Sequence, residues 1–171
     1  MKKSVLVVSL FMLVALFAAP SFAFDVVTPT DAYYVAINDP GSYILDVRTA
    51  EEWKWVAHPG ADKLGEGAGL VGKVVNIPSM IVKKGKMVLN PSFLSDVHER
   101  FEGQYVVLIT MCRSGFRGGR AAALLEEAGY VVMNMSGGFE GNADEAGYRR
   151  TLNGWIVEGL PYTYADQGYT D

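Results

Sequence analysis

The residues best suited to chemistry lie together at 112–119, which read Cys-Arg-Ser-Gly-Phe-Arg-Gly-Gly. Peptide N–H groups in a glycine-rich turn before a helix can converge on one point, and the positive end of the helix dipole favours an anion there. The guanidinium groups of Arg113 and Arg117 act in the same direction. The sequence therefore predicts that Cys112, the single cysteine of the chain, is held as a nucleophilic thiolate.

Cys112 also has a simpler interpretation, because a lone cysteine at the end of a strand is more often a buried, unreactive side chain. Arg113 and Arg117 could likewise be ordinary surface charges. With no second cysteine in the chain, an internal disulfide, dithiol redox chemistry and c-type haem attachment are not expected. The adjoining glycines and arginines favour the reactive interpretation.

The segments on either side of this run predict a buried strand before it and a helix after it. Residues 105–109 lack polar alternation, which is typical of a strand covered on both faces in a parallel sheet. A helix is expected from Arg120 to Ala128, with Gly129 as its stop. Cys112 would then lie beyond the carboxyl end of a strand, where ligands bind in α/β folds.

Strands alternate with helices along the rest of the chain, which predicts an α/β sandwich. Residues 49–52 fit a capping box, so a short helix carrying Trp53 and Trp55 should follow a strand at 43–47. The glycine-rich stretch 58–72 is expected to be a loop. The other expected elements are helices over 28–37, 90–101 and 152–158, strands over 74–78 and 130–135, and a basic, solvated turn at 83–86.

The start of the chain has the order of a secretory signal peptide. A positively charged beginning leads into an apolar run from Val5 to Ala19, and small residues suit cleavage before Phe24. The run is shorter than the roughly 20 apolar residues needed to span a bilayer. We therefore expect a signal peptide at 1–23, one domain at 24–171, and a periplasmic or secreted protein without a membrane anchor after cleavage.

The charge balance argues against a nucleic-acid-binding site, and the positions of the histidines argue against a metal site. The chain carries 15 Lys+Arg against 19 Asp+Glu, and loss of Lys2 and Lys3 with the leader would take the net charge from −4 to −6. Such a chain is too acidic for a protein that tracks nucleic-acid phosphates. Cys112, His58 and His98 have no metal-ligand spacing, so neither a metal nor another cofactor is expected. Small molecules or proteins are the favoured partners.

The loop at 112–117 resembles the active-site loop of the rhodanese family of sulfurtransferases, which commonly reads Cys-Arg-Ser-Gly-x-Arg. The resemblance spans nearly all of the chain after residue 23. It implies the rhodanese-like three-layer sandwich, in which helices flank a central, mostly parallel sheet. The other matches, in family order, are Asp46-Val47-Arg48 with Glu52 and Trp53, His58-Pro59-Gly60-Ala61, Asn76-Ile77-Pro78, Gly137-Gly138-Phe139, Trp155 and Gly159-Leu160-Pro161.

The resemblance also implies a double displacement in which Cys112 alone makes and breaks bonds. The thiolate would take a sulfane sulfur from an anionic donor, thiosulfate or polysulfide, and pass it to cyanide, a thiol or a protein acceptor. Asp46 and Arg48 are implied to support the loop, with a purely structural ion pair as an equal alternative. The implied substrate-binding residues are Arg113, Ser114, Gly115, Phe116, Arg117 and Gly118.

The chain departs from the family pattern at two insertions and at a histidine. The stretches 62–75 and 140–154 are longer than the pattern, and either could border the pocket or bind a partner, although solvated decoration fits equally well. The family's histidine usually stands two residues before the proline, whereas His58 directly precedes Pro59. His58 is therefore assigned no catalytic role.

Two other functions are compatible with the same loop. Cysteine phosphatases and arsenate reductases use a Cys-x5-Arg loop, but here the arginine falls one residue sooner, at Arg117, and Gly118 follows it. The smaller ring of amides should suit one sulfur atom better than a tetrahedral oxyanion. A non-enzymatic sulfur carrier or binding module, which hands over sulfur only within a complex, would need the same cysteine.

Overall fold

A computed structural model describes residues 24–164, so the signal peptide expected at 1–23 lies outside the described residues. A five-stranded sheet forms the centre, and each neighbouring pair of its strands is parallel. This confirms the predicted α/β class with a parallel sheet. Across the sheet the strands are β1 (Asp25–Val27), β8 (Val131–Met135), β7 (Val107–Met111), β2 (Ser42–Asp46) and β4 (Val74–Asn76).

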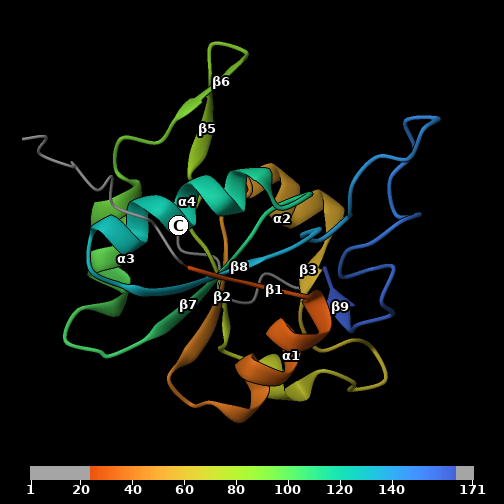
Figure 1. Cartoon of the computed structure of the whole chain (residues 1–171), viewed down its shortest axis with the longest axis horizontal. Coiled ribbons are helices and arrows are strands. Elements are labelled where there is room, and N and C mark those ends of the chain that lie inside the picture. Colours follow the sequence, from red (N-terminus) through yellow and green to blue (C-terminus); the bar gives the residue numbers. More distant parts are fainter. Residues whose placement is uncertain (1–23, 165–171) are drawn as a thin grey trace, which may run out of the picture.

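Four α-helices of the described chain pack around the sheet: α1 (Pro29–Asn38), α2 (Ala50–Val56), α3 (Phe93–Phe101) and α4 (Phe116–Glu127). The predicted caps are present, because Thr28 Oγ1 accepts from the amide of Asp31, and Thr49 and Glu52 form a complete capping box. Figure 1 shows α4 on one side of the sheet and α1 on the other. Within the described residues, no helix has the length and apolar character needed to cross a membrane.

Each strand sends alternate side chains into two separate apolar layers. In β2, Leu45 belongs to the layer that contains residues of α3 and α4, whereas Ile44 belongs to the layer that contains residues of α1. Trp53 of α2 and the distant Trp155 are also buried in the second layer. Helices on both faces explain why the central strands read as continuous apolar runs.

Two elements differ from the prediction beside Cys112. Strand β7 ends at Met111, so Cys112 follows the strand directly. Helix α4 begins at Phe116 and not at Arg120, because Gly115 takes a left-handed conformation with φ of 95° and starts the helix there. The cysteine is thus separated from the first residue of α4 by three residues.

The helix expected over 152–158 is wrong, because this stretch forms turns. Its Trp155 is fully buried, and its amide donates to the carbonyl of Gly138, so long-range packing determines its conformation.

A hairpin that the sequence analysis did not predict projects from the body. Strands β5 (Met80–Lys83) and β6 (Lys86–Leu89) pair in an antiparallel, two-stranded sheet of their own. The basic turn expected at 83–86 is confirmed as its tip. Figure 1 shows this hairpin rising away from the sheet above α4. A smaller pair, β3 (His58–Pro59) with β9 (Tyr162–Thr163), ties the glycine-rich loop to the end of the described chain.

Candidate active site

Cys112 lies at the carboxyl end of β7, on the floor of a pocket of about 640 Å³. The residue is only 1% exposed, and the pocket provides the opening above it. The amide of Gly115 donates to Cys112 Sγ over 3.2 Å. This hydrogen bond and the amino end of α4 both stabilise negative charge on the sulfur.

Gly115 is the residue that makes this hydrogen bond possible. Its φ of 95° turns the chain into α4 and directs its N–H at the sulfur. A side chain at this position would be strained in the left-handed region and would stand close to the backbone of Met135 and Gly137. The local sequence therefore requires glycine for geometry as well as for space.

The chain segment 138–141 hydrogen-bonds to the backbone of the loop that contains Cys112. The amide of Phe139 donates to the carbonyl of Cys112 at 2.8 Å, and the amide of Glu140 donates to the carbonyl of Arg113 at 2.9 Å. A Cβ atom at Gly138 would overlap with the carbonyl oxygen of Cys112. The carbonyls of Cys112 and Arg113 are thus both engaged by segment 138–141, which fixes the backbone of the loop.

Arg117 reaches the pocket with its guanidinium already paired. Its Nη1 and Nη2 atoms each donate over 2.6 Å to one oxygen of Glu52, and the amide of Thr49 also donates to Glu52. This bidentate pair joins α4 to the start of α2. The positive charge of Arg117 is therefore largely compensated before any donor enters.

The protonation of the pair follows from its partial burial. Burial by itself would favour the neutral acid, but the hydrogen bond and the charge of Arg117 outweigh it, so the pKa of Glu52 lies below its ordinary value of 4.5. Burial likewise opposes the charge of Arg117, but Glu52 raises the pKa of the guanidinium. Glu52 and Arg117 therefore form an ion pair at neutral pH.

The remaining loop residues divide between the pocket and the protein interior. Arg113, Ser114 and Phe116 line the pocket, and the side chain of Phe116 is 73% exposed. Arg113 forms no ion pair with any residue that the structure describes, so its charge is available. Gly118 lies in the first turn of α4 against Asn134, and its assigned part in substrate binding stays a prediction.

Asp46 and Arg48 form a fully buried ion pair of 2.6 Å at the end of β2. Arg48 Nη2 also donates to the carbonyl of Ala57, and its guanidinium lies 4.5 Å from the ring centre of Phe139. Phe139 in turn holds the carbonyl of Cys112. The pair thus contacts the Cys112 loop through one residue, which is compatible with the predicted bracing role and leaves it a prediction.

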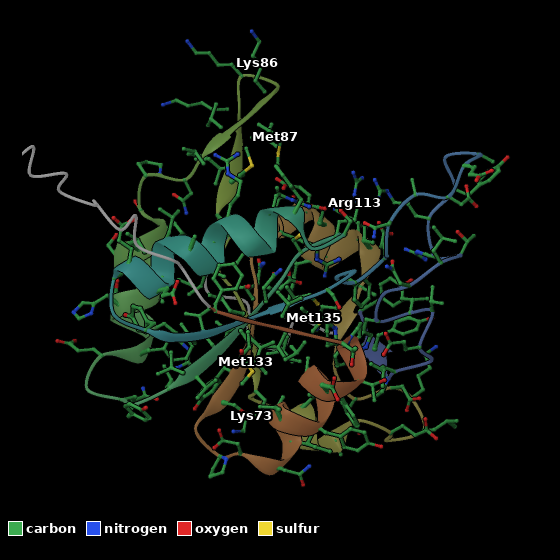
Figure 2. All side chains as sticks on the ribbon, in the orientation of Figure 1. Lys73, Lys86, Met87, Arg113, Met133 and Met135 are labelled. Carbon is green, nitrogen blue, oxygen red and sulfur yellow. The ribbon has the colours of Figure 1, made fainter. Side chains whose placement is uncertain are left out.

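The hairpin supplies two pocket residues that the sequence analysis missed. Val82 of β5 and Met87 of β6 pair in register and line the pocket together with Glu51. Figure 2 shows Met87 on the hairpin and Arg113 at the end of the Cys112 loop. Two apolar runs flanking the Lys-Lys-Gly-Lys turn were a usable hairpin signal.

Neither insertion contributes a residue to this lining, although both were expected as possible borders of the pocket. Residues of the stretch 62–75 instead border a separate cavity with 159–164, and 140–154 begins at the back of the loop.

His58 is buried and stacks on Trp53 with ring centres 3.5 Å apart, and its Nδ1 lies 2.9 Å from the carbonyl of Pro59. His58 does not line the pocket of Cys112. Among residues 24–164, no group of three or more histidine, cysteine or acidic side chains is placed to hold a metal ion.

Comparison with known protein families shows the family to which this chain belongs. Residues 30–145, which contain the cysteine loop, all of α2, α3 and α4 and all but the first residue of α1, match the rhodanese-like domain. The chain belongs to the rhodanese-like family. The resemblance drawn from the loop and its flanking motifs is thereby confirmed.

Relatives of this rhodanese-like chain extend over most of its length. An uncharacterized protein of Rickettsia prowazekii is 32% identical over 127 residues, which cover 74% of this chain and 92% of the relative. The crystal structure of Rv0390 from M. tuberculosis shares 30% identity and a TM-score of 0.67, covering 84% of this chain and all of that one. The similarity confirms the rhodanese fold over nearly the whole described region.

A more distant neighbour shares the fold alone. The polysulfide-sulfur transferase homodimer of Wolinella succinogenes has a TM-score of 0.54 at 18% identity, covering 82% of this chain and 78% of that one. At this identity the likeness concerns the arrangement of helices and strands, whereas activity has to be argued from the site itself.

Proposed function

We propose that this rhodanese-like protein is a sulfurtransferase that carries a sulfane sulfur on Cys112 as a persulfide. One observation carries the proposal: on the floor of an open pocket, Cys112 Sγ receives the Gly115 N–H at the amino end of α4. A sulfur held there has a hydrogen-bond donor directed at it and borders a pocket that a small molecule can enter.

The proposed reaction has two displacements at sulfur. The Cys112 thiolate attacks the outer sulfur of thiosulfate, the sulfur–sulfur bond of the donor breaks, and sulfite leaves with the electron pair. An acceptor such as cyanide then attacks the outer sulfur of the Cys112 persulfide, and the electron pair of that bond returns to Sγ, giving thiocyanate. Charge balances in each step, and no proton or external oxidant is needed.

Arg113 is the residue we assign to attracting an anionic donor. Its side chain is exposed at the pocket and forms no ion pair within the described chain, whereas the charge of Arg117 is compensated by Glu52. Glu51 also lines the pocket and weakens its positive potential. Because Glu51 weakens the positive potential around Arg113, the pocket suits a monoanionic polysulfide or a persulfide at least as well as dianionic thiosulfate.

The spacing of the loop favours sulfur over a tetrahedral oxyanion. Only four residues separate Cys112 from Arg117, and α4 begins within that interval at Phe116. The Arg117 guanidinium already donates to both oxygens of Glu52. Phosphate and arsenate would therefore lose the arginine that a Cys-x5-Arg loop supplies.

The decisive experiment loads the protein with thiosulfate, polysulfide or mercaptopyruvate in separate reactions and locates added sulfur by mass spectrometry. We expect one sulfur atom on Cys112 and none on the matched variant Cys112→Ser. Catalytic thiocyanate formation with cyanide supports the enzyme, and stoichiometric loading without turnover supports the carrier. Hydrolysis of phosphate esters or reduction of arsenate without sulfur transfer would overturn the proposal.

We also propose that the protein acts after export, on the strength of the signal-peptide pattern at 1–23. Cleavage before Phe24 would leave every described strand intact, because β1 begins at Asp25. Cell fractionation followed by N-terminal sequencing tests this. A full-length protein retained in the cytoplasm would contradict it.

A further inference from the structure

One face of the β5–β6 hairpin is apolar along its whole length. Met80 pairs with Leu89 and Val82 pairs with Met87, and residues that are opposite or two apart in such a sheet point to the same side. Val82 and Leu89 are each more than half exposed. A row of exposed apolar side chains on a projecting element is a common mark of an interaction surface.

This face overlies two hollows that meet at Arg117. The outer pair, Val82 and Met87, borders the pocket of Cys112. The inner pair, Met80 and Leu89, borders a second cavity of about 320 Å³. Arg117 lines both hollows. We call the combined surface the docking trough; besides the hairpin pairs, it comprises Arg117, Arg120, Ala121, Ala123 and Leu124 of α4.

The residues of α4 that line the docking trough are already ordered before a ligand binds. Arg117, at the junction, is tied to Glu52 by two hydrogen bonds of 2.6 Å, so it does not need to reorder when a ligand binds. Ala121 is buried, and Leu124 is partly exposed beside it. The result is a preformed apolar strip that leads from α4 to the cysteine.

The charges around the trough have the opposite sign to the protein as a whole. Lys83, Lys84 and Lys86 form the hairpin tip, while the chain carries a net charge of −4. Figure 2 shows Lys86 at the tip, pointing away from the body. Arg120 adds a cation at the second cavity, where Glu127 is the acidic residue, and Glu51 at the Cys112 pocket contributes one negative charge against the three lysines of the tip. An acidic partner would thus be attracted to this face and repelled elsewhere.

We propose that the docking trough binds an extended, acidic segment of a protein acceptor and presents the cysteine thiol of that segment to the Cys112 persulfide. An extended chain matches the trough because its alternate side chains can enter the apolar strip while the others stay near the lysines. Small donors and cyanide need only the pocket floor. This inference rests on the proposed sulfurtransferase activity and names its acceptor class.

The transfer itself needs no further reagent. The thiolate of the acceptor attacks the outer sulfur of the Cys112 persulfide and forms a new sulfur–sulfur bond. The bond between that sulfur and Cys112 Sγ breaks, and its electron pair restores the Cys112 thiolate. The acceptor leaves as a persulfide with the same total charge as the reactants.

The test uses the mature protein and a synthetic peptide with alternating leucine and glutamate residues and one cysteine. Persulfide formation on this peptide is compared with that on free cysteine, and thiocyanate formation from cyanide reports the basal reaction. We expect the double variant Lys86→Glu/Leu89→Ser to lower kcat/KM for the peptide about tenfold and to change cyanide turnover less than about twofold.

The matched control is Lys63→Glu/Leu64→Ser, which makes the same changes at exposed residues of the glycine-rich loop. It should leave both reactions unchanged. A peptide with serine in place of cysteine should protect the backbone amides of 80–89 from hydrogen exchange, which reports binding without chemistry. Equal losses in both double variants, or no protection of 80–89, would overturn the docking trough.

Other outcomes separate the trough from the activity. If Cys112 loads sulfur and serves cyanide but the peptide is no better than free cysteine, the trough is wrong and the sulfurtransferase stands. If Cys112 never loads sulfur, the proposed function fails first. If light scattering shows a dimer that Lys86→Glu/Leu89→Ser dissociates while peptide transfer is unchanged, the face binds a second copy, and the proposal is wrong.

Discussion

At the residue scale, the two arginines of the loop have different environments. Two nitrogens of the Arg117 guanidinium donate to the two carboxylate oxygens of Glu52. Arg113, in contrast, is exposed at the pocket and forms no ion pair in the described chain. A charge that is not compensated locally acts over a longer range on an approaching anion. Arg113 should therefore control encounter with the donor, and Arg117 should control the shape of the site.

Arg113→Ala is expected to raise KM for thiosulfate about threefold to tenfold and to change kcat little, because it removes an attraction and not a bond-making group. Arg113→Lys should recover most of the loss. Steady-state kinetics at low and high ionic strength measure the effect, which should shrink as salt rises. A matching rise in KM for Lys63→Ala, an exposed cation on another loop, would contradict a local role.

Glu52→Gln is expected to lower the free energy of unfolding by about 1–3 kcal/mol at neutral pH, because the charged hydrogen bonds to Arg117 are lost, whereas glutamine can still accept from the amide of Thr49 in the capping box. The pKa of Glu52 in the folded protein is lower than its ordinary value of 4.5. The contribution of Glu52 to the free energy of unfolding is therefore complete above pH 4.5 and is lost as the pH falls through the pKa of the folded protein.

Urea denaturation of wild type and Glu52→Gln between about pH 7 and pH 3 checks this. The difference in the free energy of unfolding should narrow at the acid end. Glu51→Gln is the control, because Glu51 is an exposed neighbour in the same helical turn. A difference that stays constant with pH would show that the ion pair does not stabilise the fold.

The sequence predicted the identity of these residues better than their partners. Cys112, Arg113 and Arg117 could be selected from one run of letters, because a glycine-rich turn between strand and helix has a known chemical use. The pairing of Arg117 with Glu52 joins residues 65 positions apart, so no local pattern announces it.

At the element scale, the site depends on the junction between β7 and α4. Gly115 ends the loop, starts the helix and donates to Cys112 Sγ. The sequence predicted both elements but placed the helix start at Arg120. The early start depends on a left-handed glycine, which letters alone do not distinguish from a flexible one.

Gly115→Ala is expected to lower the free energy of unfolding by about 1–3 kcal/mol and to slow sulfur loading about tenfold or more, because strain at positive φ displaces the N–H from Sγ. Gly129→Ala is the matched control. It has φ of 93°, with nothing within 4 Å of an added Cβ, and lies at the other end of α4. It should cost similar stability and leave loading unchanged.

Denaturation and the rate of persulfide formation, followed by mass spectrometry, are measured on both variants. If the two variants slow loading equally, then backbone strain and not the Gly115 amide explains the loss. If Gly115→Ala loads at the wild-type rate, the hydrogen bond to Cys112 contributes nothing to the chemistry.

At the scale of the whole molecule, alternation of strands and helices was sufficient to predict a parallel sheet between two helical layers. The same reasoning failed at 152–158, where apolar spacing resembled a helix but the chain forms turns. The conformation of this stretch depends on contacts made by Trp155 outside it. The Trp155 ring packs edge-on against Tyr33 of α1, and its Nε1 donates to the carbonyl of Pro161. Local periodicity cannot report such contacts.

Trp155 also couples the second apolar layer to the cysteine loop, because its amide donates to Gly138, beside the residues that hold Cys112. Trp155→Ala should cost about 3–5 kcal/mol and also slow sulfur loading by the molecules that remain folded. Phe101→Ala, in the opposite layer, should cost a similar amount without slowing loading below its melting temperature. Thermal unfolding gives the stabilities, and loading is compared well below both transitions. Equal loading rates in the two variants would mean that the layers on either side of the sheet support the site only by keeping the chain folded.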